Sequence, residues 1–114
     1  MHEYSLVEAL ISRVEAEAKK RQALKVHALS VRVGELAGVD PELFQTAYDT
    51  FRAGTICAAA PLTLTRIAAS WACPRCRQAI PRGEVLRCRA CDEPAKLDEG
   101  SDALTLDGID LEVP

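Results

Sequence analysis

The residues with the clearest chemistry are four cysteines in the second half of the chain. Cys73 and Cys76 form one C-x2-C pair, Cys88 and Cys91 form another, and eleven residues separate the two pairs. Cysteines three positions apart can face one ion from a tight turn, and two such turns complete a tetrahedron of sulfur ligands. A site filled by four protein ligands has no open position for a reactive water. We therefore expect a structural zinc ion, Zn(2+), bound by these four cysteines.

Other states of these thiols remain open from the sequence. Tetrahedral sulfur ligation suits iron as well as zinc, and the thiols could also be free or paired in disulfides. The odd total of five cysteines argues against a disulfide framework. The fifth, Cys57, has no basic neighbour within several residues, which predicts a small buried apolar side chain rather than a reactive thiol.

The segment around the four cysteines is too small to fold by burial alone. It is ~25 residues long and has few large apolar side chains, well below the size at which a hydrophobic core suffices. Residues 73–91 hold five arginines against Glu84, whereas the tail from Asp92 onward holds eight acids against Lys96. Four thiolates on one zinc ion carry a formal charge of about −2, and nearby arginines stabilise that charge. Zinc would then supply folding energy directly.

A second candidate site lies at the N-terminus. A histidine at position 2 offers a metal ion three nitrogens in fused chelate rings, namely the terminal amine of Met1 and the backbone nitrogen and imidazole of His2. Planar nitrogen donor sets of this kind favour nickel(II) or copper(II). From these residues alone, an incidental exposed histidine is the simpler interpretation. The other histidine, His27, is expected to lie on the surface or to have a protein partner.

Hydrophobic periodicity defines the first two elements. Apolar residues recur at helical spacing from Ser5 to about Lys20, and Ser5 with Glu8 fits a capping box. We therefore expect this helix to begin at Ser5, with residues 1–4 as a lead-in before it. The period changes to two over residues 25–36, which indicates a half-buried strand.

Start and stop signals define the remaining elements. Asp40 is a suitable N-cap and Pro41 a suitable first residue for a second helix. Strands are predicted over residues 62–69 and 103–113, the last with a bulge at Gly108, where the apolar phase changes. The fold class expected from this order is α+β. Two helices pack on a small, mostly antiparallel three-stranded sheet, with an inserted four-cysteine zinc-binding lobe.

Composition and missing motifs exclude several function classes. No apolar run approaches the ~20 residues that span a bilayer. The N-terminus has no basic region followed by an apolar stretch, so a cytoplasmic protein without a membrane partner is expected. There is no phosphate-binding loop, nucleophile elbow or metalloprotease motif, so we expect no enzyme. The net charge of −3 and the lack of a wide basic face argue against a nucleic-acid partner.

Four motifs along the chain are together more specific than any of these single sites. They are Met1-His2-Glu3-Tyr4-Ser5-Leu6, then Val-Gly-Glu-Leu-Ala-Gly-Val-Asp-Pro-Glu at residues 33–42, the two C-x2-C pairs, and the ending from Ala103 to Val113. In their order and separations these motifs resemble the HypA/HybF family of nickel-insertion chaperones, over essentially the whole chain. The resemblance implies a nickel-binding α+β domain of residues 1–70 and 100–114 and a zinc-binding lobe of residues 71–99.

The resemblance also implies ligands and partners. Nickel, Ni(2+), would be the transferred ion, delivered with a GTPase nickel-insertion accessory protein into the hydrogenase large-subunit precursor. In some organisms urease accessory proteins would also take part. The family's nickel ligands carry over to Met1 through its amine, to His2, and to Glu3 through its backbone nitrogen. Asp40 is a nearby carboxylate that the family also implicates, although helix capping worth ~1 kcal/mol explains it independently.

Both C-x2-C pairs depart from a common knuckle sequence, which bears on the geometry of the first knuckle and not on ligation. Metal-binding knuckles often have glycine after the second cysteine, where φ is positive, but here Arg77 and Asp92 occupy those positions. Aspartate tolerates that conformation better than arginine.

The alternatives to nickel delivery are a zinc-ribbon module for nucleic acid or protein with an inert N-terminus, which the five arginines support, and a redox protein that cycles its cysteine pairs.

Overall fold

The computed structural model of the protein describes residues 2–114. Its helices and strands follow in this order: α1 (His2–Lys20), β1 (Lys25–Gly34), α2 (Pro41–Phe51), β2 (Leu62–Ile67), β3 (Trp71–Ala72), β4 (Ala79–Ile80), β5 (Lys96–Leu97) and β6 (Leu104–Glu112). We call residues 71–99 the four-cysteine lobe, and the elements α1, β1, α2, β2 and β6 the α+β domain. None of the described helices is long and apolar enough to cross a membrane.

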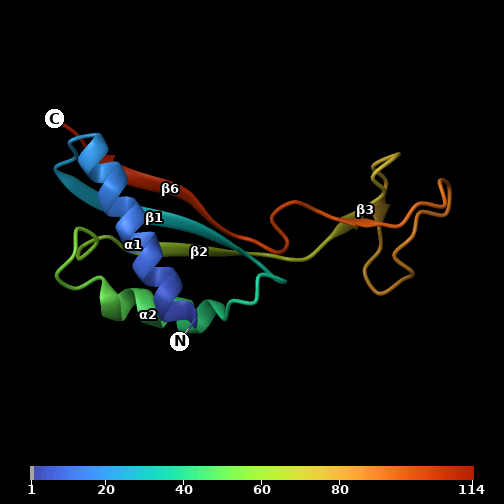
Figure 1. The fold of residues 1–114 in the computed structure, drawn as a ribbon, viewed down its shortest axis with the longest axis horizontal. Helices are drawn as coiled ribbons and strands as arrows, with labels where there is room; N and C mark the ends of the chain where they lie inside the picture. The colour runs from blue at the N-terminus through green and yellow to red at the C-terminus, as the bar shows by residue number, and fades with distance from the viewer. Residues whose placement is uncertain (1) are drawn as a thin grey trace.

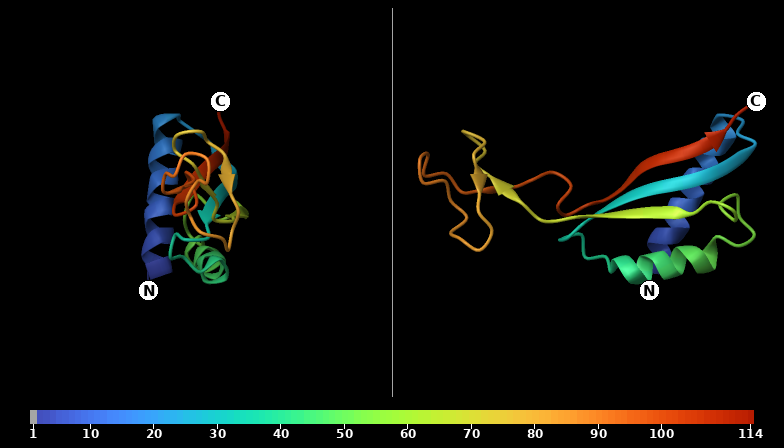
Figure 2. Two further views of the ribbon diagram at one scale, coloured as in Figure 1. Left: turned by 90° about the vertical axis from the view of Figure 1, so that its right-hand side faces the viewer. Right: turned by 180° about the vertical axis from the view of Figure 1, so that it is seen from behind.

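The α+β domain contains a three-stranded sheet in the order β2-β1-β6. Strand β1 runs parallel to β2, with α2 in the crossover between them, and antiparallel to β6. Helix α1 crosses one face of the sheet, and α2 lies beside α1 (Figure 1). The view from behind shows no helix of the described residues on the opposite face of the sheet (Figure 2). The lobe adds the antiparallel pairs β3–β4 and β3–β5. This arrangement confirms the α+β class expected from the sequence, but the three-stranded sheet has one parallel and one antiparallel pair and is not mostly antiparallel, because α2 forms a crossover between β1 and β2.

The hydrophobic core lies between the two helices and the helical face of this sheet. The side chains that fill it alternate along β1 and recur at helical spacing on α1 and α2, as Val7, Val14, Leu29, Val31, Phe44 and Tyr48 illustrate. On the other face of β1 the side chains of Ser30 and Arg32 are exposed. One apolar and one polar face explain the period of two that predicted this strand.

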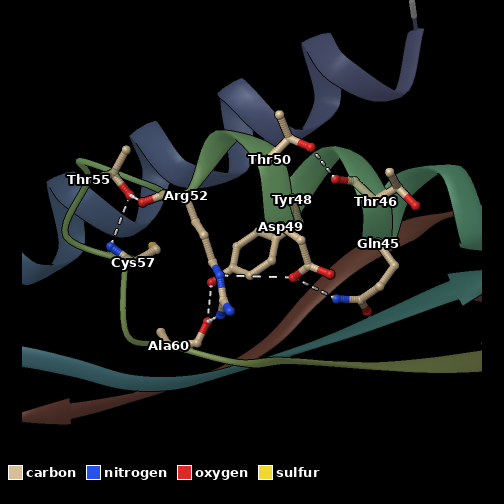
Figure 3. A network of polar contacts seen from close by, with 9 residues as sticks. All are labelled: Gln45, Thr46, Tyr48, Asp49, Thr50, Arg52, Thr55, Cys57 and Ala60. Carbon is tan, nitrogen blue, oxygen red and sulfur yellow. Dashed lines mark hydrogen bonds and ion pairs between the residues drawn. The ribbon is translucent and has the colours of Figure 1, made fainter.

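A polar network fixes the loop after α2 (Figure 3). The Tyr48 hydroxyl donates to the carbonyl oxygen of Ala60 at 2.6 Å, and Arg52 Nη1 donates to the same oxygen at 2.8 Å. Cys57 lies in this loop, is fully buried, and donates its backbone N–H to Thr55 Oγ1. Burial raises the pKa of the Cys57 thiol, and its full burial agrees with the expected apolar side chain.

The expected start of α1 at Ser5 is wrong. The helix begins at His2, so Tyr4 and Ser5 are helical and no lead-in of four residues precedes it. The Tyr4 ring packs edge-on against Phe51 of α2, with centroids 5.1 Å apart. Contact with α2 therefore stabilises a turn of helix before the capping box, because tertiary packing overrides a local start signal.

The strands of the domain are close to those expected. Strands β1 and β2 both end two residues before their predicted ends, at Gly34 and Ile67. Opposite β6 the pairing passes from Ser30↔Gly108 to Val31↔Leu106, so an extra residue is accommodated there. This register shift confirms the bulge that the apolar phase change predicts at Gly108.

The four-cysteine lobe projects from the end of the sheet (Figure 1). The molecule measures 54 × 31 × 17 Å, with a Cα radius of gyration of 17.8 Å. A compact chain of this length would have ~13 Å. The elongated shape means that the lobe contributes little to the core of the domain.

Candidate metal centre

Two turns of the same geometry hold the four cysteines. In the first, the Arg77 N–H donates to the Cys73 carbonyl at 2.8 Å and the Cys73 N–H donates to the Gln78 carbonyl at 2.9 Å. In the second, the Asp92 N–H donates to the Cys88 carbonyl at 2.8 Å and the Cys88 N–H donates to Glu93 at 2.8 Å. Each C-x2-C pair is therefore a knuckle closed by the same two backbone hydrogen bonds.

The sulfurs of these knuckles face one another. The Sγ atoms of Cys73, Cys76, Cys88 and Cys91 all lie within 4.8 Å of one another. The Cys76 and Cys88 sulfurs are 3.8 Å apart. In a tetrahedral site with zinc–sulfur bonds of ~2.3 Å, neighbouring sulfurs lie ~3.8 Å apart. The separation therefore fits a shared ion, and it is far longer than the ~2.05 Å of a disulfide bond.

The four thiols also influence one another's protonation. Hydrogen bonding from the Cys76 backbone N–H lowers the pKa of Cys73 to about 7, with help from the Arg75 N–H; both amides lie 3.4 Å from Cys73 Sγ. Hydrogen bonding with Cys76 raises the pKa of Cys91 to about 12. Adjacent thiols cannot all ionise together unless a positive ion compensates their charge. Residues and geometry thus fit a metal ion held by four thiolates.

The positions that depart from the usual knuckle sequence adopt the backbone conformation that glycine favours. Arg77 has φ of 64° and Asp92 has φ of 54°. Asp92 receives help from Arg87, whose guanidinium donates to the Asp92 carbonyl and to its carboxylate. Arg77 is held in this left-handed conformation by the knuckle hydrogen bond from its N–H to the Cys73 carbonyl.

The predicted N-terminal site falls partly outside the described residues. Met1 and the side chain of His2 lie outside them, so their geometry is not part of the structure. The Glu3 carboxylate accepts a hydrogen bond from the backbone N–H of Asp40 at 3.1 Å. Two of the residues that sequence similarity connects with nickel, 37 positions apart, are therefore neighbours at the start of α1 and the start of α2.

Asp40 and His27 behave as the sequence predicts in their simpler roles. Asp40 caps α2, with Oδ1 accepting from the backbone N–H groups of Glu42 at 3.0 Å and Leu43 at 3.2 Å. His27 Nε2 lies 2.8 Å from a carboxylate oxygen of Glu112, on the surface of the sheet. His27 therefore has a protein partner and is not part of the four-cysteine cluster.

One contact between the lobe and the rest of the protein has no local sequence signal. Arg82, in the loop after β4, donates through both terminal nitrogens to the carboxylate of Glu35, which follows β1. The partners are 47 residues apart. Only the excess of arginines in the lobe and the motif at residues 33–42 marked these positions in the sequence.

Fold and site together define a small α+β protein that carries a metal centre in a separate lobe. A family model described as hydrogenase/urease nickel incorporation, metallochaperone, HypA, matches residues 1–111. The hydrogenase maturation factor HypA of Shewanella oneidensis is 41% identical over 101 residues, covering 89% of this chain and 73% of the relative. That of Wolinella succinogenes is 32% identical over 114 residues, covering 98% and 96%.

Solved structures agree with this match. A solution structure of the Ni metallochaperone HypA from Helicobacter pylori has a TM-score of 0.70 at 28% identity and covers 98% of both chains. A second solution structure of a HypA protein has a TM-score of 0.78 at 29% identity, covering 100% of this chain and 98% of the other. The chain belongs to the HypA family of metallochaperones for nickel incorporation into hydrogenase and urease. Its role is that of a non-catalytic maturation factor.

Proposed function

We propose that the chain binds nickel(II) at its N-terminus and delivers it, with a GTPase partner, into the large-subunit precursor of nickel–iron hydrogenase. Urease accessory proteins are a second destination in organisms that make urease. The chain has no phosphate-binding loop of its own, so nucleotide hydrolysis belongs to the partner. In this proposal these steps take place in the cytoplasm, where thiols stay reduced.

In this proposal the four-cysteine lobe, residues 71–99, holds zinc and the remainder holds nickel. Cys73, Cys76, Cys88 and Cys91 would bind zinc, which supplies charge compensation and folding energy when bound. With four protein ligands this ion stays in place while nickel is exchanged. The nickel-binding domain would comprise residues 1–70 and 100–114.

The observation that carries the nickel proposal is the hydrogen bond between Glu3 and Asp40. It places an exposed carboxylate beside the first turn of α1, where the Met1 amine and the His2 nitrogens would be the main ligands. As the first residue of α1, His2 has a backbone amide without a helical acceptor, because the first amides of any helix lack one. That amide is therefore available as a metal ligand, as the nitrogen donor set requires.

Capping and nickel binding by Asp40 are compatible. Both cap hydrogen bonds end on Oδ1. A carboxylate has two oxygens with about four acceptor sites, so Oδ2 can approach an ion while Oδ1 holds the start of α2. The backbone nitrogen of Glu3 and the Asp40 carboxylate would complete or adjust the site that Met1 and His2 begin.

A nickel titration tests the proposal directly. Zinc-loaded protein with its N-terminus untagged is titrated with nickel by calorimetry and absorbance, alongside His2→Ala and a form with one extra residue before Met1. We expect about one nickel ion for the native protein and loss of binding in both variants, with zinc unchanged. His27→Ala is the matched control, because it removes the other histidine and should leave nickel binding intact.

Two Asp40 variants separate capping from ligation. Asparagine is a good N-cap but carries no charge, whereas alanine neither caps a helix nor carries a charge. If Asp40 contacts nickel, Asp40→Asn keeps the helix and weakens nickel binding; if it only caps, Asp40→Asn binds nickel like the native chain and Asp40→Ala loses stability alone. Equal nickel binding by native protein, His2→Ala and the extended form would overturn the N-terminal site and favour a zinc module with an inert N-terminus.

A further inference from the structure

The motif at residues 33–42 contains more than the helix cap. Gly34 ends β1 where residues 100 and 101 cross it, and a Cβ atom on Gly34 would lie 2.2 Å from the Gly100 carbonyl oxygen and 2.4 Å from Ser101. No side chain fits there, because real Cβ contacts do not come below ~3.0 Å. Glycine at this position lets the chain that returns from the four-cysteine lobe pass directly over the end of β1.

Two short connectors, residues 68–70 and 100–103, join the lobe to the domain. Ser70 Oγ donates to Asp98 Oδ2 at 2.6 Å, and the Asp98 N–H donates to the Ser70 carbonyl at 2.8 Å. The Leu36 N–H donates to the Ser101 carbonyl at 2.8 Å, and Ser101 is buried. The first two bonds join the connector 68–70 to Asp98, at the C-terminal end of the lobe, and the third fastens the connector 100–103 to the loop after β1; none of them involves residues 71–97.

Glu35 is the residue that makes this connection. One of its carboxylate oxygens accepts from the Ala69 N–H at 2.9 Å and from Arg82 Nη1 at 2.6 Å, and the other accepts from Arg82 Nη2. Within residues 2–114, Arg82 is the one side chain of the four-cysteine lobe whose hydrogen bonds extend past the connectors into the domain. Glu35 thus holds a connector with one bond and the lobe with two.

The geometry of this contact favours orientation over stability. Both side chains are partly exposed, at 58% for Arg82 and 39% for Glu35, and exposed ion pairs add little to folding. A two-pronged guanidinium–carboxylate pair does fix relative orientation, because both planes must align. The Arg82 side chain, together with the Ala69 amide, lowers the pKa of Glu35 to about 2. The contribution of the charged Glu35 carboxylate to stability is complete above pH 4.5, its ordinary pKa, and is lost only as the pH falls towards 2.

The same loop leads to the proposed nickel site. Glu35 stands five residues before Asp40, whose backbone N–H is bound by Glu3. Between them the chain turns at Gly38, with φ of +74°. A movement of the lobe would therefore act on Glu35, and through one short loop on the residue beside the start of α1.

We propose that Glu35 and Arg82 are positioning residues for nickel transfer: their ion pair fixes the direction of the four-cysteine lobe relative to the N-terminal site, so that a protein acceptor contacts both in one arrangement. This rests on the proposed function for the nickel site, but the geometry of the ion pair does not. Without the pair the lobe keeps its metal and its fold, and swings on the two connectors.

Orientation is measured first, with no nickel present. Residual dipolar couplings and amide relaxation of the zinc-loaded full chain are compared for native protein, Arg82→Ala and Arg82→Lys. We expect one alignment and one tumbling time for native protein, separate values for domain and lobe in Arg82→Ala, and an intermediate result for Arg82→Lys, which keeps the charge but not the planar fork. Arg89→Ala, which removes another exposed arginine of the lobe, is the matched control and should behave as native.

Glu35 variants check the other side of the pair. Glu35→Gln retains an acceptor for the Ala69 amide but loses the ion pair, so it should release the lobe as Arg82→Ala does. Glu84→Gln removes an exposed acid of the lobe two positions from Arg82 and should change nothing. If Arg82→Ala and Glu35→Gln both keep the native alignment with unchanged zinc content, the ion pair does not position the lobe and the inference is wrong.

Nickel transfer then tests the purpose of the orientation. Nickel-loaded native protein and Arg82→Ala are mixed with a small chelator or with the apo hydrogenase large-subunit precursor and its GTPase. We expect equal nickel affinity and equal transfer to the chelator, but slower transfer to the protein acceptor by Arg82→Ala. Equal transfer to the protein acceptor would overturn the positioning role while leaving the nickel site intact. Failure of the proposed function would be detected separately in the nickel titration, as nickel binding that His2→Ala does not change.

Discussion

The α+β domain and the four-cysteine lobe are held together by different interactions. The domain buries a continuous cluster from both helices and the sheet, with Val7, Val14 and Tyr48 fully inaccessible. Between residues 71 and 99 the only buried hydrophobic residues are Cys73 and Cys88. Domain stability therefore comes from apolar burial, whereas the lobe has little apolar burial and four sulfurs placed so that a metal ion could stabilise it.

This difference assigns different tasks to the two regions. A domain that folds by burial keeps its shape whether or not its cargo is bound, so an exchangeable nickel site can be emptied without unfolding. A lobe that folds around its ion cannot release that ion without losing its structure. The proposed roles, transferred nickel on the domain and resident zinc in the lobe, match these two kinds of stability.

Removal of a metal ion from the four-cysteine lobe should have the largest effect on the structure. If it unfolded the whole chain, the domain and the lobe would not be stabilised independently. Cys76→Ser, or chelation of the native protein, removes a binding free energy that for structural zinc sites is ~10–16 kcal/mol. We expect amide signals from residues 71–99 to collapse towards random-coil shifts while those of the α+β domain persist. The measurement is a heteronuclear NMR spectrum with zinc analysis.

Cys57→Ala provides the control for that experiment. It removes a thiol from the core of the domain and should leave the zinc content unchanged. Loss of the domain signals together with those of the lobe in Cys76→Ser would show that the two regions fold as one unit.

A core truncation in the domain tests the opposite case. Phe44 is 1% exposed, so Phe44→Ala should lower the free energy of unfolding of the domain by ~3–5 kcal/mol. Leu43, its neighbour on α2, is 37% exposed, and Leu43→Ala should cost much less. Denaturant unfolding followed by circular dichroism measures both variants. Zinc release in step with the Phe44→Ala transition would mean that the lobe requires the domain.

How far the sequence predicts each region also follows from these interactions. The four cysteines could be identified because their spacing alone encodes the knuckles, and Asp40 because capping is local. The strands of the domain could be identified because one buried face imposes a period of two. Positive φ at Arg77 and Asp92 follows from the knuckle geometry, and the structure confirms it.

Contacts between distant residues could not be predicted in this way. The first turn of α1 depends on Tyr4 against Phe51, and neither residue signals that contact. The parallel pairing of β1 with β2 depends on how α2 packs in the crossover. Arg82 could be recognised as one of several arginines, but its partner Glu35 could be recognised only once the connectors had a defined course.

The smallest expected effect concerns backbone strain in the knuckles, and it sharpens the comparison because the domain contains a matched position. Arg77, Asp92 and Gln22 are the described non-glycine residues with positive φ. Alanine and glycine variants at one position both lose the original side chain, so their difference isolates the strain of a Cβ atom, ~1 kcal/mol.

Strain at a lobe position should therefore change zinc binding, and strain at the domain position should not. We expect Arg77→Gly to bind zinc more tightly than Arg77→Ala in competition with a chromophoric chelator, with a difference of the same sign at Asp92. At Gln22, which follows α1, glycine should instead raise the free energy of unfolding of the domain relative to alanine and leave zinc affinity unchanged. A change in zinc affinity at Gln22 would contradict the independence of the two regions. No difference at Arg77 would mean that the metal site, rather than the backbone, determines the shape of the knuckle.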